Sequence, residues 1–290
     1  MVRERSTVKK EKKTAVIEFE ILARGLYRPN LLDITYDPSL RMPNSPAIQE
    51  WMDALWEKKL ALAHQQGIPL YDSQLFRLVS AEAQSDGRLK LVLGNTSYKE
   101  YTTTQEPEFF TGRDRQELSN ALAVCSVVET SNGYILYEKR QNVSVHVGRY
   151  HVVAGFFERD RDIDANGQPN PFGAMLREIR EETGIQLSDV TEQYCLGSVY
   201  DVGTPHAELC FLTKLHIPLS EVHTRTPEDH EIQQLLSLYV TPESLREFII
   251  SNHGNISATG EPNLLMYGGL RFGEEWFEEE MGLLISHHLM

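Results

Sequence analysis

Three glutamates in one short segment are the residues of this chain whose types and spacing point most directly to chemistry. Glu178, Glu181 and Glu182 stand at positions i, i+3 and i+4, and because a helix turns by about 100° per residue their carboxylates share one face. Like charges at these spacings repel by about 0.2–0.5 kcal/mol per pair, and Arg177 can offset part of this by pairing with Glu181. The pattern is typical either of a salt-bridged surface helix or of a site for a hard divalent cation such as Mg²⁺, which prefers oxygen ligands.

The residues around this segment predict a helix over 171–183. Asn170 and Pro171 suit the N-cap and the first helical position, and Gly184 suits the left-handed position just past the end. A buried stripe with helical spacing lies away from the glutamates, formed by Phe172, Met175, Leu176 and Ile179.

Residues 177–185, REIREETGI, match the second half of the Nudix box at every specified position. The box is written G-x5-E-x7-R-E-U-x-E-E-x-G-U, where U is an apolar residue. The preceding stretch YHVVAGFFE resembles the strand and glycine turn that open the box, with Gly155 as the motif glycine. With a predicted hairpin before it and a helix in place, the segment resembles the Nudix hydrolase superfamily.

This resemblance implies a Nudix α/β/α sandwich with a mixed sheet and a metal site. Glu178, Glu181 and Glu182 would hold Mg²⁺, or else Mn²⁺, with the Gly155 carbonyl as a further ligand. Arg177 would orient the glutamates rather than contact the substrate. One glutamate would take a proton from the attacking water, while the metal neutralises the charge of a diphosphate.

The first half of the box departs from the motif. Gly155 and Arg177 are 22 positions apart, where the motif spaces them by 14, so the loop 156–170 is eight residues longer. The first motif glutamate then falls on Pro169 and has no clear counterpart. Glu158 is the candidate replacement, while the loop aspartates, Asp162 among them, are expected to be solvated.

The N-terminal half narrows the resemblance. The stretches LWEKKLA, YDSQLFRLVSAEA and GRLKLVLGNTSYKEY resemble the N-terminal region of the animal Nudix UDP-glucose pyrophosphatases. The resemblance implies Mg²⁺-dependent hydrolysis of a nucleoside diphosphate derivative, with UDP-glucose or UDP-galactose giving UMP and a sugar 1-phosphate. Two alternatives stay open: a Nudix pyrophosphatase for ADP-ribose or another dinucleotide, and a non-catalytic nucleotide-sugar sensor.

Further site residues are expected outside the box. The segment EDHEIQQLLSLYVTPESL resembles the one that supplies an additional catalytic carboxylate, which makes Glu231 the first choice, with Glu208 second and also a substrate contact. Arg140 and Arg149 are candidates for phosphate binding, and Tyr98 for stacking on a base. The competing interpretations are exposed acids, structural ion pairs and a core tyrosine.

The order of elements indicates an α+β chain with a mixed sheet and helices on its faces. A smaller N-terminal α+β domain precedes the Nudix domain. The expected strands include 14–24, two around the turn 85–87, two around the Asn-Gly turn at 131–133, and YHVVAGFF read as one strand. The expected helices are 45–67, 171–183, 241–251 and 274–286. The predicted divisions are a basic flexible tail 1–13, an N-terminal domain 14–117 and a Nudix domain 118–290.

Composition excludes several classes of function. The chain has 290 residues and a net charge of −14, which disfavours binding to nucleic acid. No apolar run is long enough to cross a bilayer. Its three cysteines, Cys125, Cys195 and Cys210, fit no disulfide framework or zinc site, which indicates a cytoplasmic, reducing location. The resemblance leaves a homodimer open.

Overall fold

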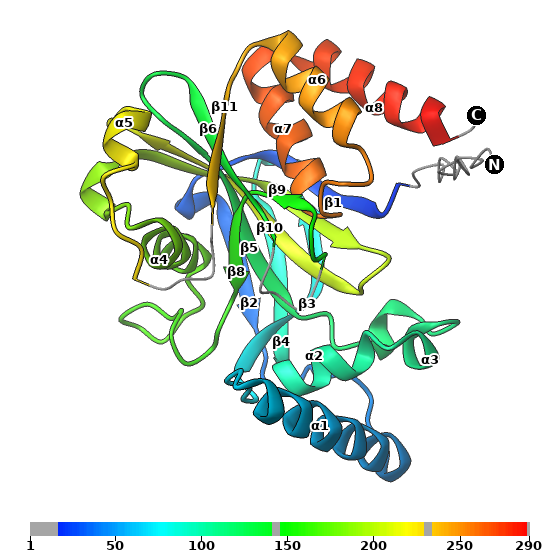
Figure 1. Cartoon of the computed structure of the whole chain (residues 1–290). Coiled ribbons are helices and arrows are strands. Elements are labelled where there is room, and N and C mark those ends of the chain that lie inside the picture. The colour runs from blue at the N-terminus through cyan, green and yellow to red at the C-terminus, as the bar shows by residue number, and fades with distance from the viewer. Residues whose placement is uncertain (1–16, 141–145, 229–233, 289–290) are drawn as a thin grey trace, which may run out of the picture.

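The computed structural model describes residues 17–140, 146–228 and 234–288, and an eight-stranded mixed sheet forms its centre (Figure 1). The strands of this sheet are β1 (Phe19–Tyr27), β5 (Leu122–Glu129), β6 (Tyr134–Lys139), β7 (Tyr150–His151), β8 (Val153–Phe156), β9 (Val190–Asp201), β10 (His206–Leu215) and β11 (Leu235–Tyr239). The order is β1-β9-β10-β5-β6-β11, with β7 beside β6 and β8 beside β5. β5 and β10 are parallel and the other pairs are antiparallel. The predicted α+β class with a mixed sheet is confirmed.

A smaller sheet of three strands lies near the N-terminus. It consists of β2 (Leu32–Tyr36), β4 (Leu89–Ser97) and β3 (Gln74–Ala83), in that order. Its strand β3 is joined to the second half of the chain, because Phe76 N donates to Phe157 O at 3.0 Å and Leu78 N to Asn120 O at 2.9 Å. β1 also crosses over to pair with β9. The division of the chain at residue 118 therefore stays a prediction.

Helices cover both faces of the large sheet (Figure 1). They are α1 (Pro46–Gln66), α2 (Tyr98–Thr104), α3 (Pro107–Phe110), α4 (Pro171–Thr183), α5 (Leu219–Val222), α6 (Pro242–Asn252), α7 (Gly260–Phe272) and α8 (Glu274–His288), with 3-10 turns at Pro29–Leu31, Arg115–Glu117 and Leu187–Asp189. One core cluster joins the sheet to α4 and to the small sheet. The other joins the opposite face to α6, α7 and α8.

The cap residues define α1 and α4 as the sequence predicts. The Asn170 side chain accepts a hydrogen bond from Gly173 N at 3.0 Å, and Gly184 takes a left-handed φ of 73°. In α1, the Ser45 side chain accepts from Ile48 N at 3.3 Å, and Gly67 has φ 68°. The position of the glutamates on α4 therefore follows from local sequence.

Two parts of the sequence interpretation are wrong. YHVVAGFF is not one strand, because the strand is interrupted at Val152. Its two parts pair with different neighbours, β7 with β6 and β8 with β5. The helix α7 was not predicted. Pro262 and the pair Gly268 and Gly269 lower its helix propensity, but Gly268 is required by packing, since a Cβ there would lie 2.0 Å from the Trp276 ring.

Gly268→Ala is expected to destabilise the protein by about 1–3 kcal/mol, because the added methyl overpacks the contact between α7 and α8. Urea unfolding measures the change. Gly282→Ala in α8 is the matched control, since a Cβ at Gly282 meets nothing within 4 Å. That substitution is expected to stabilise by about 0.5–1 kcal/mol through helix propensity. Equal effects of the two substitutions would contradict the packing explanation.

Three further sequence predictions concern the cysteines, membrane spans and the basic tail. The three cysteines are buried and free. Within the described residues no helix is long and apolar enough to span a membrane. The basic tail 1–13 lies outside the described residues.

Candidate active site

Arg177 is the centre of a hydrogen-bond network between α4 and the loop 156–170. Its Nε and Nη2 donate to the two carboxylate oxygens of Asp162 at 2.8 and 2.7 Å, and Nη2 also donates to the Phe156 carbonyl at 3.0 Å. Its Nη1 donates to Glu178 Oε1 at 2.7 Å and to Glu181 Oε2 at 3.1 Å. Hydrogen bonds of this kind between charged groups are among the strongest in proteins. The contacts suit the predicted orienting role, which stays a prediction.

The partner of Arg177 corrects the expectation that the loop aspartates are solvated. Asp162 is buried, and its Oδ2 also accepts from the backbone N of Glu158 at 2.8 Å. The loop 156–170 therefore supplies a carboxylate to the motif arginine where Pro169 cannot. One signal points to this contact: a largely buried arginine needs a carboxylate partner, and the loop is rich in aspartates.

Gly155 allows the Glu178 side chain to lie against β8. A Cβ at residue 155 would come within 2.0 Å of the Glu178 carboxyl carbon, so any side chain there would force Glu178 out of this position. Glu178 is only 8% exposed, and this burial raises the pKa of its carboxyl to about 8 despite the nearby Arg177. The motif glycine and the first glutamate of the helix are therefore in direct contact.

The carboxylates of the helix are held by guanidinium groups. Glu181 Oε1 forms an ion pair with Arg161 and lies 3.6 Å from Arg180 Nη2, while its Oε2 accepts from Arg177. Glu182 is buried. In the described ranges no group of three or more His, Cys, Asp or Glu side chains is arranged to hold a metal ion. Two of the three carboxylates, Glu178 and Glu181, are therefore engaged by arginines, and the metal assignment stays a prediction.

The oxygen atoms proposed as metal ligands nevertheless suit a hard divalent cation. Their chemistry is oxygen only, which matches Mg²⁺ and Mn²⁺. Two of the ligand residues, Glu178 and Glu182, are buried carboxylates, and buried carboxylates are stable as ions when they are paired or coordinate a metal. The space beside Glu178 is kept free of any side chain by Gly155.

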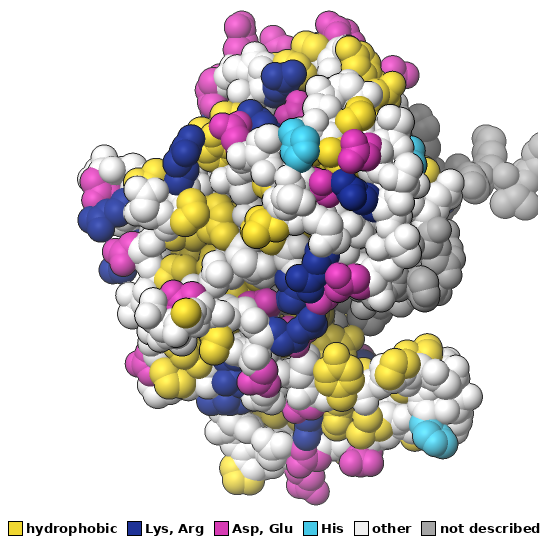
Figure 2. Space-filling model, turned by 90° about the vertical axis from the view of Figure 1, so that its left-hand side faces the viewer, with side chains coloured by type: hydrophobic (Ala, Val, Ile, Leu, Met, Phe, Trp, Pro, Cys, Tyr) yellow, Lys and Arg dark blue, Asp and Glu magenta, His cyan; other side chains and the backbone are white. Residues whose placement is uncertain are grey.

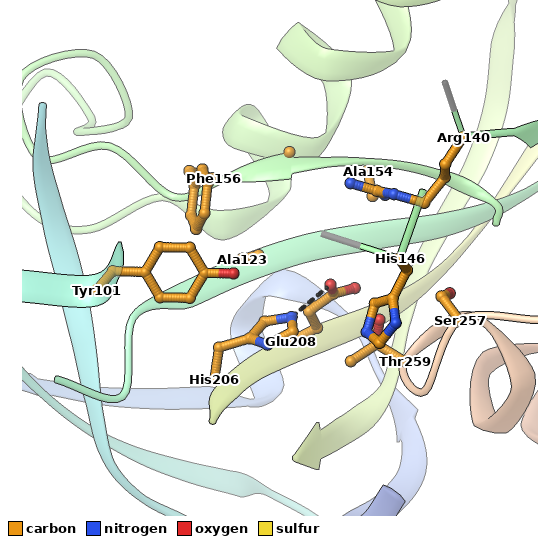
Figure 3. Close-up of a pocket in the computed structure, with 11 residues that line it drawn as sticks. Tyr101, Ala123, Arg140, His146, Ala154, Phe156, His206, Glu208, Ser257 and Thr259 are labelled. Atoms are coloured by element: carbon orange, nitrogen blue, oxygen red, sulfur yellow. Dashed lines mark hydrogen bonds and ion pairs between the residues drawn. The ribbon is translucent and has the colours of Figure 1, made fainter. Parts of the chain in front are cut away.

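A pocket of about 70 Å³ adjoins this site on the side of Gly155 (Figure 3). Its lining comes from distant parts of the chain: Tyr101, Ala123, Arg140, His146, Ala154, Gly155, Phe156, His206, Glu208, Ser257 and Thr259. Figure 3 shows Tyr101 directed from α2 toward His206 and Glu208 on β10. Pockets that enclose whole ligands measure about 300–1,000 Å³, so this one can take only a part of a nucleotide derivative.

Glu208 is a buried anion in the wall of the pocket. His206 Nε2 lies 3.2 Å from its Oε1, while its Oε2 has no hydrogen-bond partner among the described residues. Burial alone would raise the pKa of Glu208, but the hydrogen bond with His206 holds it below the usual value. Burial likewise opposes protonation of His206, whose pKa is raised above its usual value by Glu208 and Asp201. Glu208 is therefore ionised at neutral pH and able to accept a hydrogen bond.

His151 lies behind the pocket and is neutral at neutral pH. Its Nδ1 is 2.5 Å from Ser257 Oγ, and its Nε2 is 3.8 Å from Glu208 Oε2. Burial lowers the pKa of His151 to about 3. Below pH 6.5 the unfolded chain binds a proton at this residue and the folded protein does not, so stability falls as the pH falls toward 3.

His151→Gln is expected to remove part of this acid sensitivity. The stability of the parent protein should fall by roughly 1 kcal/mol per pH unit below pH 6.5 through His151, and that slope should be smaller in the variant. Urea unfolding between pH 7 and pH 5 measures both slopes. His64→Gln, at an exposed position on α1, is the control and should leave the slope unchanged. Identical slopes in all three proteins would contradict this assignment.

The other predicted contacts have different places. Arg140 lines the pocket. Arg149 forms an ion pair with Glu18, with Nη2 at 3.2 Å from Oε1. Tyr98 packs edge-on against Phe156, with 5.7 Å between the centres of the two rings. Neither Arg149 nor Tyr98 is among the residues that line the described pocket, so their substrate roles stay predictions. Glu231 lies outside the described residues.

The face of the molecule that carries α4 and α5 has mixed charge. Figure 2 shows Lys and Arg side chains next to Asp and Glu side chains near the middle of this face. Basic groups thus lie beside the acidic ones in spite of the net charge of −14. An anionic ligand at this face would meet both signs of charge.

No protein-family model and no curated protein matches this sequence. Solved structures resemble it over roughly half of the chain. One is the Nudix domain of Shewanella oneidensis NrtR complexed with ADP ribose, with TM-score 0.36 and 14% identity, covering 58% of this chain and 97% of that chain. Another is a Nudix hydrolase from Nitrosomonas europaea, with TM-score 0.35 and 16% identity, covering 50% and 86%.

A third structure is larger than the matched region. The bifunctional NMN adenylyltransferase/ADP ribose pyrophosphatase from Francisella tularensis, complexed with AMP and a Mn ion, has TM-score 0.39 and 14% identity. The match covers 59% of this chain and 46% of that one. These likenesses concern the arrangement of strands and helices over part of the chain. The chemistry of the site depends on the residues of this chain.

Proposed function

We propose that this protein is a Nudix-type pyrophosphatase that hydrolyses the diphosphate bond of a nucleoside diphosphate derivative with a divalent metal, Mg²⁺ or Mn²⁺. One observation carries the proposal: Arg177 joins Asp162 of the loop 156–170 to Glu178 and Glu181, and Gly155 lies against the Glu178 carboxyl group. This network brings together the residues that match the motif. It does so at the edge of a pocket that has room for part of a ligand.

In this proposal Glu178, Glu181 and Glu182 hold the metal, together with the Gly155 carbonyl. When bound, the metal neutralises the charge of the diphosphate and lowers the pKa of a water molecule. Arg177 holds α4 against the loop 156–170 and so fixes the orientation of the Glu178 and Glu181 carboxylates. One of these three glutamates, with a carboxylate oxygen that binds neither the metal nor an arginine, accepts the proton of the attacking water.

The substrate proposed first is UDP-glucose or UDP-galactose, which would give UMP and a sugar 1-phosphate. The resemblance in the N-terminal half supports this choice. Tyr101, from the same half, forms one wall of the pocket. Glu208 would contact the part of the substrate beyond the diphosphate, because hydroxyl groups can donate to the buried carboxylate. Arg140 would contact the diphosphate itself, because a guanidinium can bind a phosphate oxygen.

A second candidate is a sensor that binds a nucleotide sugar without cleaving it. The observation that favours it is the engagement of both Glu181 oxygens by arginines, which leaves that carboxylate less available to a metal. A panel distinguishes the candidates. The full chain is incubated with Mg²⁺ and UDP-sugars, ADP-ribose, NADH or coenzyme A, and phosphate is measured after phosphatase treatment, which removes terminal phosphates and does not cleave the internal diphosphate. Coenzyme A carries a terminal phosphate of its own, so its signal is compared with that of a reaction without the protein.

Fastest turnover of UDP-glucose or UDP-galactose would support the first proposal. Much faster turnover of ADP-ribose would contradict the substrate assignment and leave the reaction class in place. Absence of turnover on every compound would contradict the pyrophosphatase and favour the sensor.

Glu208→Gln is expected to raise KM about tenfold with a smaller change in kcat, because it removes an ionic acceptor for the substrate and leaves the residues of α4 unchanged. Steady-state kinetics on the best substrate of the panel measures both constants. Glu192→Gln, at a partly exposed position on β9 that pairs with Lys214, is the control. A KM unchanged in both variants would place the substrate elsewhere.

A further inference from the structure

The loop 156–170 brings a second arginine to the carboxylates of α4. Arg161 Nη2 forms an ion pair with Glu181 Oε1, and its Nη1 lies 3.7 Å from Glu158 Oε1. The other oxygen of Glu181 accepts from Arg177. Both oxygens of Glu181 are thus engaged by guanidinium groups, whose positive charge opposes the binding of a metal ion to this carboxylate.

The two arginines differ in how firmly they are held. The Arg177 side chain is 10% exposed and is fixed by Asp162 and by the Phe156 carbonyl in addition to the glutamates. The Arg161 side chain is 44% exposed, and its ion-pair partners in the described part of the chain are Glu158 and Glu181. Removing the partner of a buried charge is strongly unfavourable, whereas an exposed ion pair exchanges readily with water. Arg161 is the group that can leave.

We propose that Arg161 is a resident counter-cation that competes with the divalent metal for Glu181 and Glu158. The inference rests on the proposed function, because it concerns the same metal site. In the metal-free protein the guanidinium offsets the mutual repulsion of the carboxylates around it. Binding of a divalent cation releases Arg161 into solvent, so the metal affinity of this chain is set in part by the loop 156–170.

Binding of Mn²⁺ alone, without any substrate, tests the competition. The signal of free Mn²⁺ in electron paramagnetic resonance gives the Kd of the full chain for the parent protein, Arg161→Gln, Arg180→Gln and Glu182→Gln. Arg180 is the matched control: its side chain is 41% exposed, and it lies 3.6 Å from Glu181 and 3.0 Å from Glu228. Both arginine variants remove one positive charge near Glu181, but only one removes the proposed competitor.

Arg161→Gln is expected to tighten Mn²⁺ binding about fivefold, the upper range for a partly exposed ion pair, and Arg180→Gln about twofold or less. An unchanged or weaker affinity in Arg161→Gln, or an equal gain in both variants, would overturn the inference. If Arg161→Gln fails in one of these ways while Glu182→Gln abolishes Mn²⁺ binding, the proposed metal site is supported and only the competition by Arg161 is refuted. If the parent protein binds no Mn²⁺, or Glu182→Gln binds it as well as the parent does, the metal site and the competition fail together.

Discussion

Replacing Glu182 with glutamine is expected to lower kcat at least about hundredfold, the scale of losing one group that stabilises charge at the reacting centre. The amide has nearly the shape of the carboxylate but not its charge. Because Glu182 is buried on α4, water cannot replace the lost ligand. Steady-state kinetics with Mg²⁺ on the best substrate of the panel measures the effect.

The control for this prediction is a carboxylate far from the loop and the pocket. Glu192→Gln removes one negative charge from β9 and should keep kcat within about twofold, because surface substitutions rarely have large effects. A kcat for Glu182→Gln within tenfold of the parent value would contradict the role assigned to this glutamate. The surface-helix interpretation of the segment would then be the better one.

Replacing Asp162 with asparagine is expected to destabilise the protein by about 1–3 kcal/mol, because the largely buried guanidinium of Arg177 loses its two-point ionic partner and keeps Glu178, Glu181 and the Phe156 carbonyl. The substitution should also lower kcat, since Arg177 would no longer hold the loop against α4. Urea unfolding measures the stability, and kinetics measures the turnover.

Asp160→Asn is the matched control for this change. Asp160 lies in the same loop and carries the same charge, but it is exposed. Its substitution should change the stability by less than about 0.5 kcal/mol. Equal stability of the two variants would show that the ion pair between Arg177 and Asp162 does not hold the loop.

Local sequence determined the helix that carries the glutamates. Asn170, Pro171 and Gly184 act within a few residues of the helix ends, so their effect is visible in the sequence. The sequence does not predict the helix α7, because Gly268 serves a contact with Trp276 that only the folded chain creates. Propensity is a weak guide wherever packing decides the structure.

The lining of the pocket could not be predicted from the sequence either. Its lining joins α2, the strands around the box and the segment before α7, and these segments meet only through long-range strand pairing. Glu208 was a candidate from its position in the chain, whereas Asp162 was set aside as a solvated residue. Its burial depends on the course of the extended loop, for which the motif spacing provides no template.

One measurement tests the central claim most directly. The full chain and Glu182→Gln are incubated with UDP-glucose in ¹⁸O-labelled water, with Mg²⁺ or with EDTA, and the products are analysed by mass spectrometry. The account predicts Mg²⁺-dependent formation of UMP and glucose 1-phosphate, with one ¹⁸O atom on one of the two phosphates, and at least about hundredfold less product from the variant. Equal product with EDTA, or equal product from Glu182→Gln, would contradict a metal-dependent hydrolysis at these glutamates.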